Sequence, residues 1–199
     1  MDNAEKIKFG EAMKVNLRPL ESKDLSFIHD LTNERHVMAF WFEEPYESLD
    51  ELTSLYNKHI HDDDERRFVI DVENKFAGIV ELANINFIHR TTEIQIIVKS
   101  DFQGYGLAKI AMYKGMDYAF SILNMHKVYL FVDTENHKAI HVYEALGFVK
   151  EGSLRQQFFV EGKYHDSIIM GILKDEFKVI PDANIKEPDG IKKQRKRPA

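Results

Sequence analysis

Residues 103–108 read Gln-Gly-Tyr-Gly-Leu-Ala, and this is the sharpest pattern in the sequence that could carry chemistry. The segment follows a strand-like stretch and precedes a helix-like one. Glycines at such a junction let backbone N–H groups turn towards an anion, and the helix N-terminus adds positive potential. A pyrophosphate would fit, although the spacing is neither the Walker pattern nor the full dinucleotide fingerprint. A tight strand-to-helix turn needs glycines without any ligand, so the pattern alone leaves both interpretations open.

A dense run of carboxylates is the second pattern. Positions 43 to 65 contain nine acidic side chains and one basic side chain, Lys58, so the net charge of this stretch is −8. The formal charge of the whole chain is −6, divided into −9 for residues 1–178 and +3 for residues 179–199. The acidic body argues against a nucleic-acid backbone as the main partner and favours a cationic one. A solvated helical face is the commoner meaning of a charge run, so that alternative also stays open.

Length and composition bound the class of protein. The chain has 199 residues, of which 44% are hydrophobic and 12% aromatic, which suits one domain with a sizeable core. There are no cysteines, which excludes disulfides, thiolate nucleophiles and cysteine zinc sites and agrees with the cytosol. No signal-like or membrane-spanning apolar segment is visible, so we expect a cytoplasmic protein without a membrane partner.

The domain organisation follows from the same composition. We expect an N-terminal extension at 1–14, one domain at 15–178 and a flexible basic tail at 179–199. The tail could touch RNA or another acidic surface, but its composition favours a solvated, disordered end, and it has no assigned role.

The residues that could carry chemistry must be positioned by strands and helices, which the apolar pattern of the sequence predicts. Strands are expected at 15–19, 68–71, 76–89, 92–98, 127–132, 148–151, 157–160 and 167–173. Helical spacing predicts helices capped by Ser22 and Ser48, and further helices at 107–123 and 136–146, the last ending before Gly147. The pattern predicts an α+β (α/β mixed) fold. Its mixed, mainly antiparallel central β-sheet is flanked by helices and has a βαβα segment at its centre.

Two signatures make the chain resemble the GCN5-related N-acetyltransferase (GNAT) superfamily. Gln103, Gly106 and Ala108 resemble the loop that binds the pyrophosphate of acetyl-coenzyme A (acetyl-CoA). Residues 136–148 resemble the second signature, Asn-x-x-Ala-x-x-x-Tyr-x-x-x-Gly-Phe, about 30 residues downstream. The resemblance implies the GNAT fold, acetyl-CoA as co-substrate and direct acetyl transfer to an amine.

Four further blocks are similar to bacterial spermidine N-acetyltransferases, namely residues 40–47, 55–62, 65–69 and 86–90. The similarity extends over residues 15–177. It implies transfer of an acetyl group from acetyl-CoA to a primary amine of spermidine or spermine. It also implies a homo-oligomer, a dodecamer of stacked hexameric rings, with an allosteric polyamine site between subunits.

The resemblance implies catalytic roles for Glu93 and Tyr143. An amine must lose its proton before it attacks, and a carboxylate such as Glu93 can hold the ammonium and take the proton, directly or through water. Tyr143 matches the tyrosine that protonates the departing CoA thiolate. Without the resemblance, Glu93 would be a half-exposed strand residue paired with a neighbour, and Tyr143 would be a core aromatic.

The resemblance also implies which residues bind the two substrates. Backbone groups of Ile96, Ile97 and Val98 would pair with the pantetheine arm, and Asn136 would hydrogen-bond to it. The implied acetyl-CoA residues are Ile96, Ile97, Val98, Gln103, Gly104, Tyr105, Gly106, Leu107, Ala108, Lys109, Asn136, Lys138 and Ala139. The implied polyamine residues are Met38, Glu43, Glu51, His59, Ile60, His61, Asp62, Glu93, Ile94 and Gln95.

No metal is expected, with Glu43 as the one candidate ligand. A member of the family places a divalent metal between the position of Glu43 and a second carboxylate, where this chain has Asn84. A neutral amide is a weaker ligand for a hard cation.

Two alternative functions remain open from the sequence. The chain could acetylate protein N-termini or another small amine on the same fold, or it could be a polyamine-binding sensor that performs no catalysis. The sequence does not determine the choice between spermidine and spermine, or which nitrogen would react.

Overall fold

In the computed structural model, residues 14–41, 44–59 and 63–178 are described, and their seven strands form one sheet in the order β1-β2-β3-β4-β5-β7-β6. The strands are β1 (Val15–Pro19), β2 (Arg66–Val72), β3 (Lys75–Asn86), β4 (Thr91–Val98), β5 (Lys127–Asp133), β6 (Val149–Val160) and β7 (Lys163–Leu173). Neighbouring strands are antiparallel, except that β4 and β5 are parallel. The predicted mixed, mainly antiparallel sheet is confirmed.

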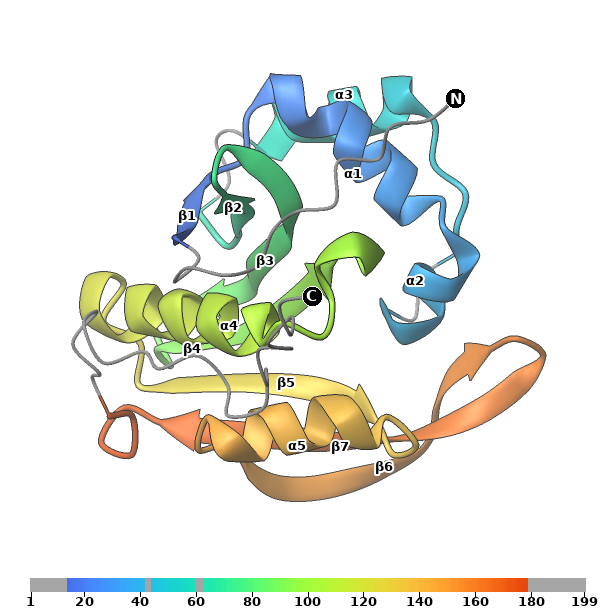
Figure 1. Ribbon diagram of the computed structural model, residues 1–199. Helices are drawn as coiled ribbons and strands as arrows, with labels where there is room; N and C mark the ends of the chain where they lie inside the picture. The colour runs from blue at the N-terminus through green and yellow to red at the C-terminus, as the bar shows by residue number, and fades with distance from the viewer. Residues whose placement is uncertain (1–13, 42–43, 60–62, 179–199) are drawn as a thin grey trace, which may run out of the picture.

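Helices flank the sheet, as predicted. The α-helices of the described part are α1 (Leu25–Thr32), α2 (Arg35–Trp41), α3 (Leu49–His59), α4 (Leu107–Asp117) and α5 (His137–Ala145). In Figure 1, α1, α2 and α3 gather at one side of the molecule, whereas α4 and α5 lie along the central and C-terminal strands. Because parallel neighbours need a crossover connection, α4 joins β4 to β5 and α5 follows β5, which confirms the predicted βαβα segment.

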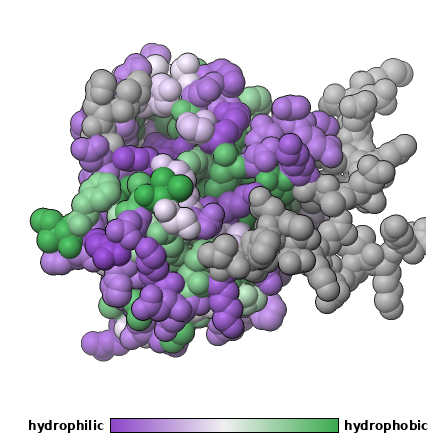
Figure 2. All heavy atoms as spheres, turned by 90° about the vertical axis from the view of Figure 1, so that its left-hand side faces the viewer, coloured by the Kyte–Doolittle hydropathy of each residue, from purple (hydrophilic) through white to green (hydrophobic). Residues whose placement is uncertain are grey.

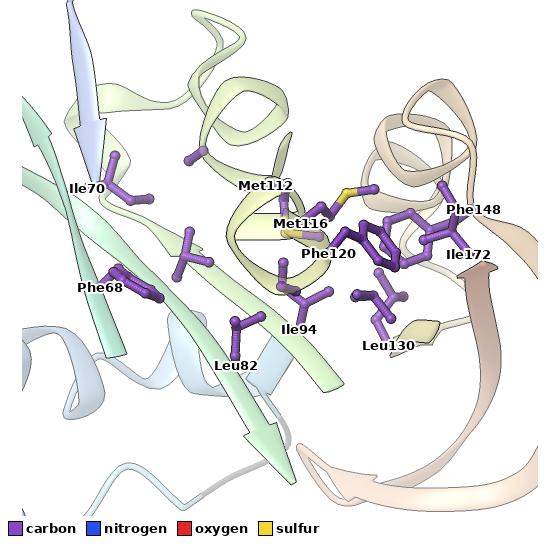
Figure 3. Packing of buried hydrophobic residues seen from close by; sticks show 14 of the residues in the cluster. Phe68, Ile70, Leu82, Ile94, Met112, Met116, Phe120, Leu130, Phe148 and Ile172 are labelled. Atoms are coloured by element: carbon purple, nitrogen blue, oxygen red, sulfur yellow. The ribbon is translucent and has the colours of Figure 1, made fainter. Parts of the chain in front are cut away.

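Two apolar clusters hold the helices on the sheet. The larger one packs α4 against the central strands, and its members Leu82, Ile94 and Met116 are at most 1% exposed (Figure 3). The smaller one joins Leu52 and other residues of α1 and α3 to Ile79 and Ile97 of β3 and β4. Burying a side chain of this size contributes about 1.5–3 kcal/mol, so the helices are held mainly by these contacts.

The alternation of β4 determines which of its side chains meet which cluster. Ile94 lies in the larger cluster, on the α4 side, and Ile97 lies in the smaller one. Successive strand residues point to opposite faces of a sheet. Glu93 and Gln95, on either side of Ile94, therefore project to the face that carries α1 and α3.

The two predicted helix caps had different outcomes. Ser48 begins α3 as expected, because its Oγ accepts the Glu51 N–H at 3.1 Å and its own N–H donates to the Glu51 carboxylate at 3.0 Å. This is a capping box. The prediction that Ser22 caps the first helix was wrong: Glu21 is the N-cap of a short 3₁₀ turn (η1, Ser22–Asp24) that leads into α1, and it forms a capping box with Asp24.

Several element bounds differ from the predictions. The segments expected as two strands near the C-terminus form one, β6, because β7 pairs with it across two irregularities in register. The helix expected at 107–123 is α-helical to Asp117 and continues as a π-helical turn, η3 (Tyr118–Ile122). A short 3₁₀ turn, η2 (Ser100–Phe102), precedes α4, and α2 was not predicted.

The surface agrees with this burial of apolar residues. On the face in Figure 2, hydrophilic residues predominate and apolar residues form small separate groups. Among the described residues, no helix combines the length and the apolar character needed to cross a membrane.

Gly78→Ala should destabilise the fold strongly, because β3 approaches β4 closely at this residue. Gly78 has a φ of +151°, and an added Cβ would lie 2.1 Å from the Ile97 carbonyl oxygen. We expect chemical denaturation to show a loss of about 3 kcal/mol or more. Gly162→Ala is the matched control: its φ is +83°, and its Cβ would meet nothing within 4 Å. This variant should cost about 1–2 kcal/mol, and equal losses for the two variants would contradict the close approach.

Candidate functional site

The sheet opens between β4 and β5. The two strands pair only where residues 91–93 face residues 127–129. Beyond that point, β4 keeps β3 on one side but has no strand partner on the other among the described residues. Such a free backbone edge can accept an extended ligand as an added strand. It includes Ile96, Ile97 and Val98, which the sequence assigned to acetyl-CoA.

The glycine-containing loop leads from this edge into α4. Gly104 and Gly106 have φ values of +85° and +73°, in the left-handed region that glycine adopts at little cost. Gln103 Nε2 donates to the Val98 carbonyl at 2.9 Å, which fixes the loop to the end of β4.

The first turn of α4 offers backbone donors to an anion. Gly106 is the N-cap and has no side chain to accept the N–H groups of the first turn, whose residues are Leu107, Ala108 and Lys109. Backbone N–H groups left without a capping side chain at a helix N-terminus form an anion site. The geometry therefore suits the pyrophosphate predicted from residues 103–109, of which Lys109 is exposed and Tyr105 partly buried.

Asn136 begins α5 close to the end of β5. Its Oδ1 accepts the Ala139 N–H at 3.1 Å. Because this bond engages the side-chain oxygen, a contact between Asn136 and pantetheine would come from the side-chain NH₂. Lys138 is exposed in the first turn of the same helix.

Tyr143 lies on α5 at the edge of the larger apolar cluster. Its ring contacts that of Phe148, with centroids 6.0 Å apart. Burial raises the pKa of Tyr143 to about 12, so the hydroxyl keeps its proton at neutral pH. The tyrosine is thus both the packed aromatic that the sequence alternative described and a protonated donor.

Glu93 ends the paired part of β4 and is only 8% exposed. Its two oxygens are held by neutral amides: Gln95 Nε2 donates to Oε1 at 2.8 Å, and Asn84 Nδ2 donates to Oε2 at 3.1 Å. Opposite on β5 lies Tyr129, whose pKa is raised by burial and by the negative charge of Glu93. A buried carboxylate that is held by amides suits a cationic amine, because charge-assisted hydrogen bonds are strong.

Asn84 reaches Glu93 because β3 bulges there. The register of β3 and β4 shifts between residues 83 and 86, and Asn84 has a φ of +51°. Its NH₂ group, not its oxygen, faces the Glu93 carboxylate. The side chain therefore orients Glu93 and offers no ligand oxygen towards it.

A second site is an acidic groove of about 710 Å³ beside α1, α2 and α3. Its lining combines four carboxylates, one ammonium, three other polar groups and two apolar side chains. The lining residues are Thr32, Met38, Glu44, Tyr46, Glu47, Asp50, Glu51, Ser54, Leu55 and Lys58. Carboxylates around apolar wall atoms suit a cation whose charges are separated by methylenes.

The sequence-predicted polyamine residues do not all meet in this groove. Met38 and Glu51 line it, whereas His59 lies at the other end of α3 and pairs with Glu65 at 2.8 Å. Glu93 and Gln95 lie at the sheet opening. The Ile94 side chain is 1% exposed inside the larger cluster, so only its backbone is available to a ligand. Glu43, Ile60, His61 and Asp62 fall outside the described residues, as does the tail.

Sequence reasoning missed several groove residues. Glu44, Glu47 and Asp50 belong to the acidic run that the sequence made conspicuous, but no residue-level assignment included them. The signal was the spacing of the groove residues on α3, where Asp50, Ser54 and Lys58 recur every four positions along one helix face.

A buried ionic cluster lies on the same sheet face as Glu93. The Arg67 Nε contacts a carboxylate oxygen of Glu65 and one of Glu81. Burial and the hydrogen bond with Glu65 raise the pKa of Glu81 to about 8. The pKa of Glu65 is lowered: burial opposes this, but the hydrogen bond with Glu81 and the charge of Arg67 outweigh it. The two carboxyl groups therefore keep one proton, on Glu81, at neutral pH.

A third group of polar side chains was also not predicted from the sequence. Ligand atoms of Asp133, Glu135 and His165 lie within 4.8 Å of one another, where β5 ends beside β7. His165 Nδ1 lies 2.7 Å from the Asp133 carboxylate, and the Glu135 N–H donates to the same carboxylate at 2.8 Å. These bonds fix the start of the segment that leads to Asn136.

Comparison with known proteins agrees with this geometry. The family model of the acetyltransferase (GNAT) domain matches residues 14–149. Spermidine N(1)-acetyltransferase of Vibrio cholerae is 53% identical over 165 residues, covering 82% of this chain and 95% of the relative.

Solved structures are similar to this fold as well. The crystal structure of the Vibrio cholerae spermidine N-acetyltransferase in complex with CoA and spermine has a TM-score of 0.80 at 53% identity, covering 81% of this chain and 96% of that one. A dodecameric structure of the same enzyme has a TM-score of 0.74 at 52% identity, covering 81% and 94%.

Glu81→Gln should make the protein less sensitive to alkaline pH. The folded-state pKa of Glu81, about 8, lies above its ordinary value of 4.5, so the folded chain binds the proton more tightly than the unfolded chain. This contribution is fully present below pH 4.5 and is lost as pH rises through 8. Melting temperatures measured between pH 6 and pH 9 should therefore fall more for the unaltered protein than for the variant. Glu144→Gln, on the exposed side of α5, controls for the removal of a charge, and parallel curves for the unaltered protein and Glu81→Gln would contradict the assignment.

Proposed function

The chain belongs to the acetyltransferase (GNAT) family and, within it, to the spermidine N-acetyltransferases, and we propose that it transfers an acetyl group from acetyl-CoA to a primary amine of spermidine or spermine. The observation that carries the proposal is Glu93: a nearly buried carboxylate at the end of the β4–β5 pairing, held by two neutral amides. A cationic substrate and an anionic co-substrate then meet at one opening of the sheet.

The residues of the opening fit acetyl-CoA in two places. The free edge of β4 supplies backbone groups of Ile96, Ile97 and Val98 to an extended pantetheine arm, and the uncapped N-terminus of α4 supplies donors to a pyrophosphate. When bound, acetyl-CoA supplies a thioester, whose carbonyl carbon is the electrophile. A backbone N–H of β4 that points at the carbonyl oxygen would stabilise the charge that develops there.

Glu93 prepares the amine. An ammonium has no lone pair, and a primary amine is almost wholly protonated at neutral pH. Glu93 attracts the ammonium into the opening and takes its proton, directly or through water. The neutral nitrogen then forms a bond to the carbonyl carbon, the bond from that carbon to sulfur breaks, and the acylated nitrogen releases its second proton to solvent to give the neutral amide. Glu93 also returns its proton to solvent before the next turnover.

Tyr143 is the proposed proton donor to the leaving group. The sulfur departs as a thiolate, and the Tyr143 hydroxyl donates to it a hydrogen bond and then its proton. Burial holds the pKa of Tyr143 at about 12, so the proton is present at the start of each turnover. Solvent then returns a proton to the tyrosine. No covalent acyl-enzyme forms, which agrees with the absence of cysteine.

The acidic groove supports a second, regulatory binding of polyamine. It is separate from Glu93, and its four carboxylates outnumber the single Lys58. We infer that a polyamine bound there shifts the enzyme towards its active state. A titration of rate against polyamine should then be sigmoidal.

We further infer an oligomer, a dodecamer like that of the Vibrio cholerae enzyme. The β6–β7 hairpin supports this inference, because Phe159 and Tyr164 pack against each other while remaining 63% and 65% exposed. Exposed aromatics of this kind suit a subunit interface. The chain is further proposed to act in the cytoplasm as one catalytic domain, residues 15–178, with a short extension before it and a basic tail after it.

The test of the proposed function is a substrate panel. Purified full-length protein with acetyl-CoA should release CoA thiol fastest with spermidine or spermine, and the curve against polyamine should be sigmoidal. Faster release with other small amines or N-terminal peptides would favour the alternative substrates. Polyamine binding by calorimetry without any thiol release would favour the sensor. A hyperbolic curve would contradict the regulatory part alone.

Tyr143→Phe should reduce turnover about 100-fold or more, because proton transfer by a positioned side chain typically contributes that much. The Phe ring keeps the packing against Phe148, so acetyl-CoA binding measured by calorimetry should change less than about twofold. Tyr118→Phe, on η3 with its ring against Phe68 of β2, is the matched control and should keep the original turnover. If Tyr143→Phe turns over at the original rate, the tyrosine has no part in protonating the thiolate.

A further inference from the structure

Arg67 and Glu81 form a buried polar contact, between a guanidinium and a carboxyl group that keeps its proton at neutral pH. Glu81 is 5% exposed, and its side chain meets Arg67 across the β2–β3 pairing, where the two residues are direct register partners. Buried polar and ionic contacts often contribute little net stability relative to apolar residues, because the guanidinium charge and the polar carboxyl group both lose their hydration. The cost suggests a role other than stability.

The pair adjoins the residue that orients Glu93. Glu81 is the register partner of Gln95 across β3 and β4, as Ala83 is of Glu93. Partners on one face of an antiparallel pair have Cβ atoms about 4.5–5.5 Å apart. Glu81 therefore lies beside Gln95, which donates to Glu93 Oε1 at 2.8 Å.

The pair also reaches the helix of the acidic groove. Arg67 contacts Glu65, and Glu65 lies 2.8 Å from Nδ1 of His59, the last residue of α3. The same helix lines the groove with Asp50, Glu51, Ser54, Leu55 and Lys58. A continuous set of polar contacts thus runs from the end of α3, through Glu65 and Arg67, to Glu81 of β3, whose register partner on β4 is Gln95.

We propose that Arg67 and Glu81 form a positioning pair, which fixes the strand surface where Gln95 orients Glu93 and couples this surface through Glu65 and His59 to the groove helix α3. The inference rests on the proposed function, because it concerns the same carboxylate. Glu81 keeps its proton at neutral pH, so it can donate to Glu65 while it accepts from Arg67. A neutral residue with a donor and an acceptor should therefore replace it.

The test compares three variants in steady-state kinetics. Arg67→Met removes the cation that orders the two carboxyl groups and should lower kcat/KM for the amine about tenfold, as loss of orientation does. Its curve against polyamine should become less sigmoidal, while KM for acetyl-CoA stays within about twofold of the original, since the β4 edge and the α4 N-terminus are untouched. Glu81→Gln should keep kcat/KM within about twofold, whereas Glu81→Leu should behave as Arg67→Met does.

Arg18→Met is the matched control. Arg18 forms a comparable, partly buried ion pair with Asp24 at 2.7 Å, but this pair lies at β1 and η1, away from Glu93. It should lower the melting temperature and leave the kinetic constants unchanged. If Arg67→Met and Arg18→Met have the same kinetics, or if Arg67→Met alters the constants for amine and acetyl-CoA in equal proportion, the pair is only structural and the proposal fails.

Two measures keep the outcome interpretable. If Arg67→Met does not fold, Arg67→Lys replaces it: lysine keeps the charge but lacks the planar fork that reaches two carboxylates. It should lose part of kcat/KM for the amine, and an unchanged value would overturn the proposal. The ratios are taken with the amine that the unaltered protein accepts best. If the unaltered protein does not acetylate spermidine, the proposed function fails. The positioning role is then still tested by the same comparison of variants, made with the amine that the unaltered protein does accept.

Discussion

The structure depends on one short contact, the parallel pairing of β4 and β5 over three residue pairs. Parallel neighbours cannot be joined by a tight turn, so the chain must cross over through α4. Because the pairing stops at Glu93, the rest of β4 keeps a free edge, and α4 starts beside it with its N-terminus uncapped by any side chain. The free backbone edge of β4, the uncapped N-terminus of α4 beside it and the position of Glu93 at the opening are all consequences of where this contact ends.

The carboxyl groups on the α1–α3 side of the sheet differ in how far their negative charge is compensated by neighbouring groups. Glu93 is held by two neutral amides, which leave its negative charge uncompensated. Glu81 and Glu65 share one guanidinium and keep one proton between them, which lowers the net charge of that cluster. In the groove, four carboxylates have only Lys58 among the lining residues. Negative charge is therefore concentrated in the groove and at Glu93, and it is reduced in the buried cluster with Arg67.

Local patterns predicted the elements well where the signal lies within a few residues. The Ser48 cap of α3 and the end of α5 before the left-handed Gly147 follow from neighbouring side chains and backbone freedom. Predictions failed where a residue distant in the sequence determines the local structure. β6 is continuous because β7 pairs along it. Ser22 does not cap α1 because the chain enters that helix through η1, where Glu21 and Asp24 form the capping box and Arg18 of β1 binds Asp24. The bulge that brings Asn84 to Glu93 has no local signal of that contact.

The sequence by itself determined the family, the α+β class, the two cofactor signatures and the acidic run. Each of these features depends on residues that are close together in the chain. Only the tertiary structure decided that Glu93 is buried between amides and that Ile94 faces away from it, because strand alternation and register place neighbours on opposite faces. It also decided that four carboxylates of the acidic run line a groove, whereas Glu65 joins Arg67 in a buried cluster. Charge along a chain is local, but its burial depends on which distant strands and helices cover it.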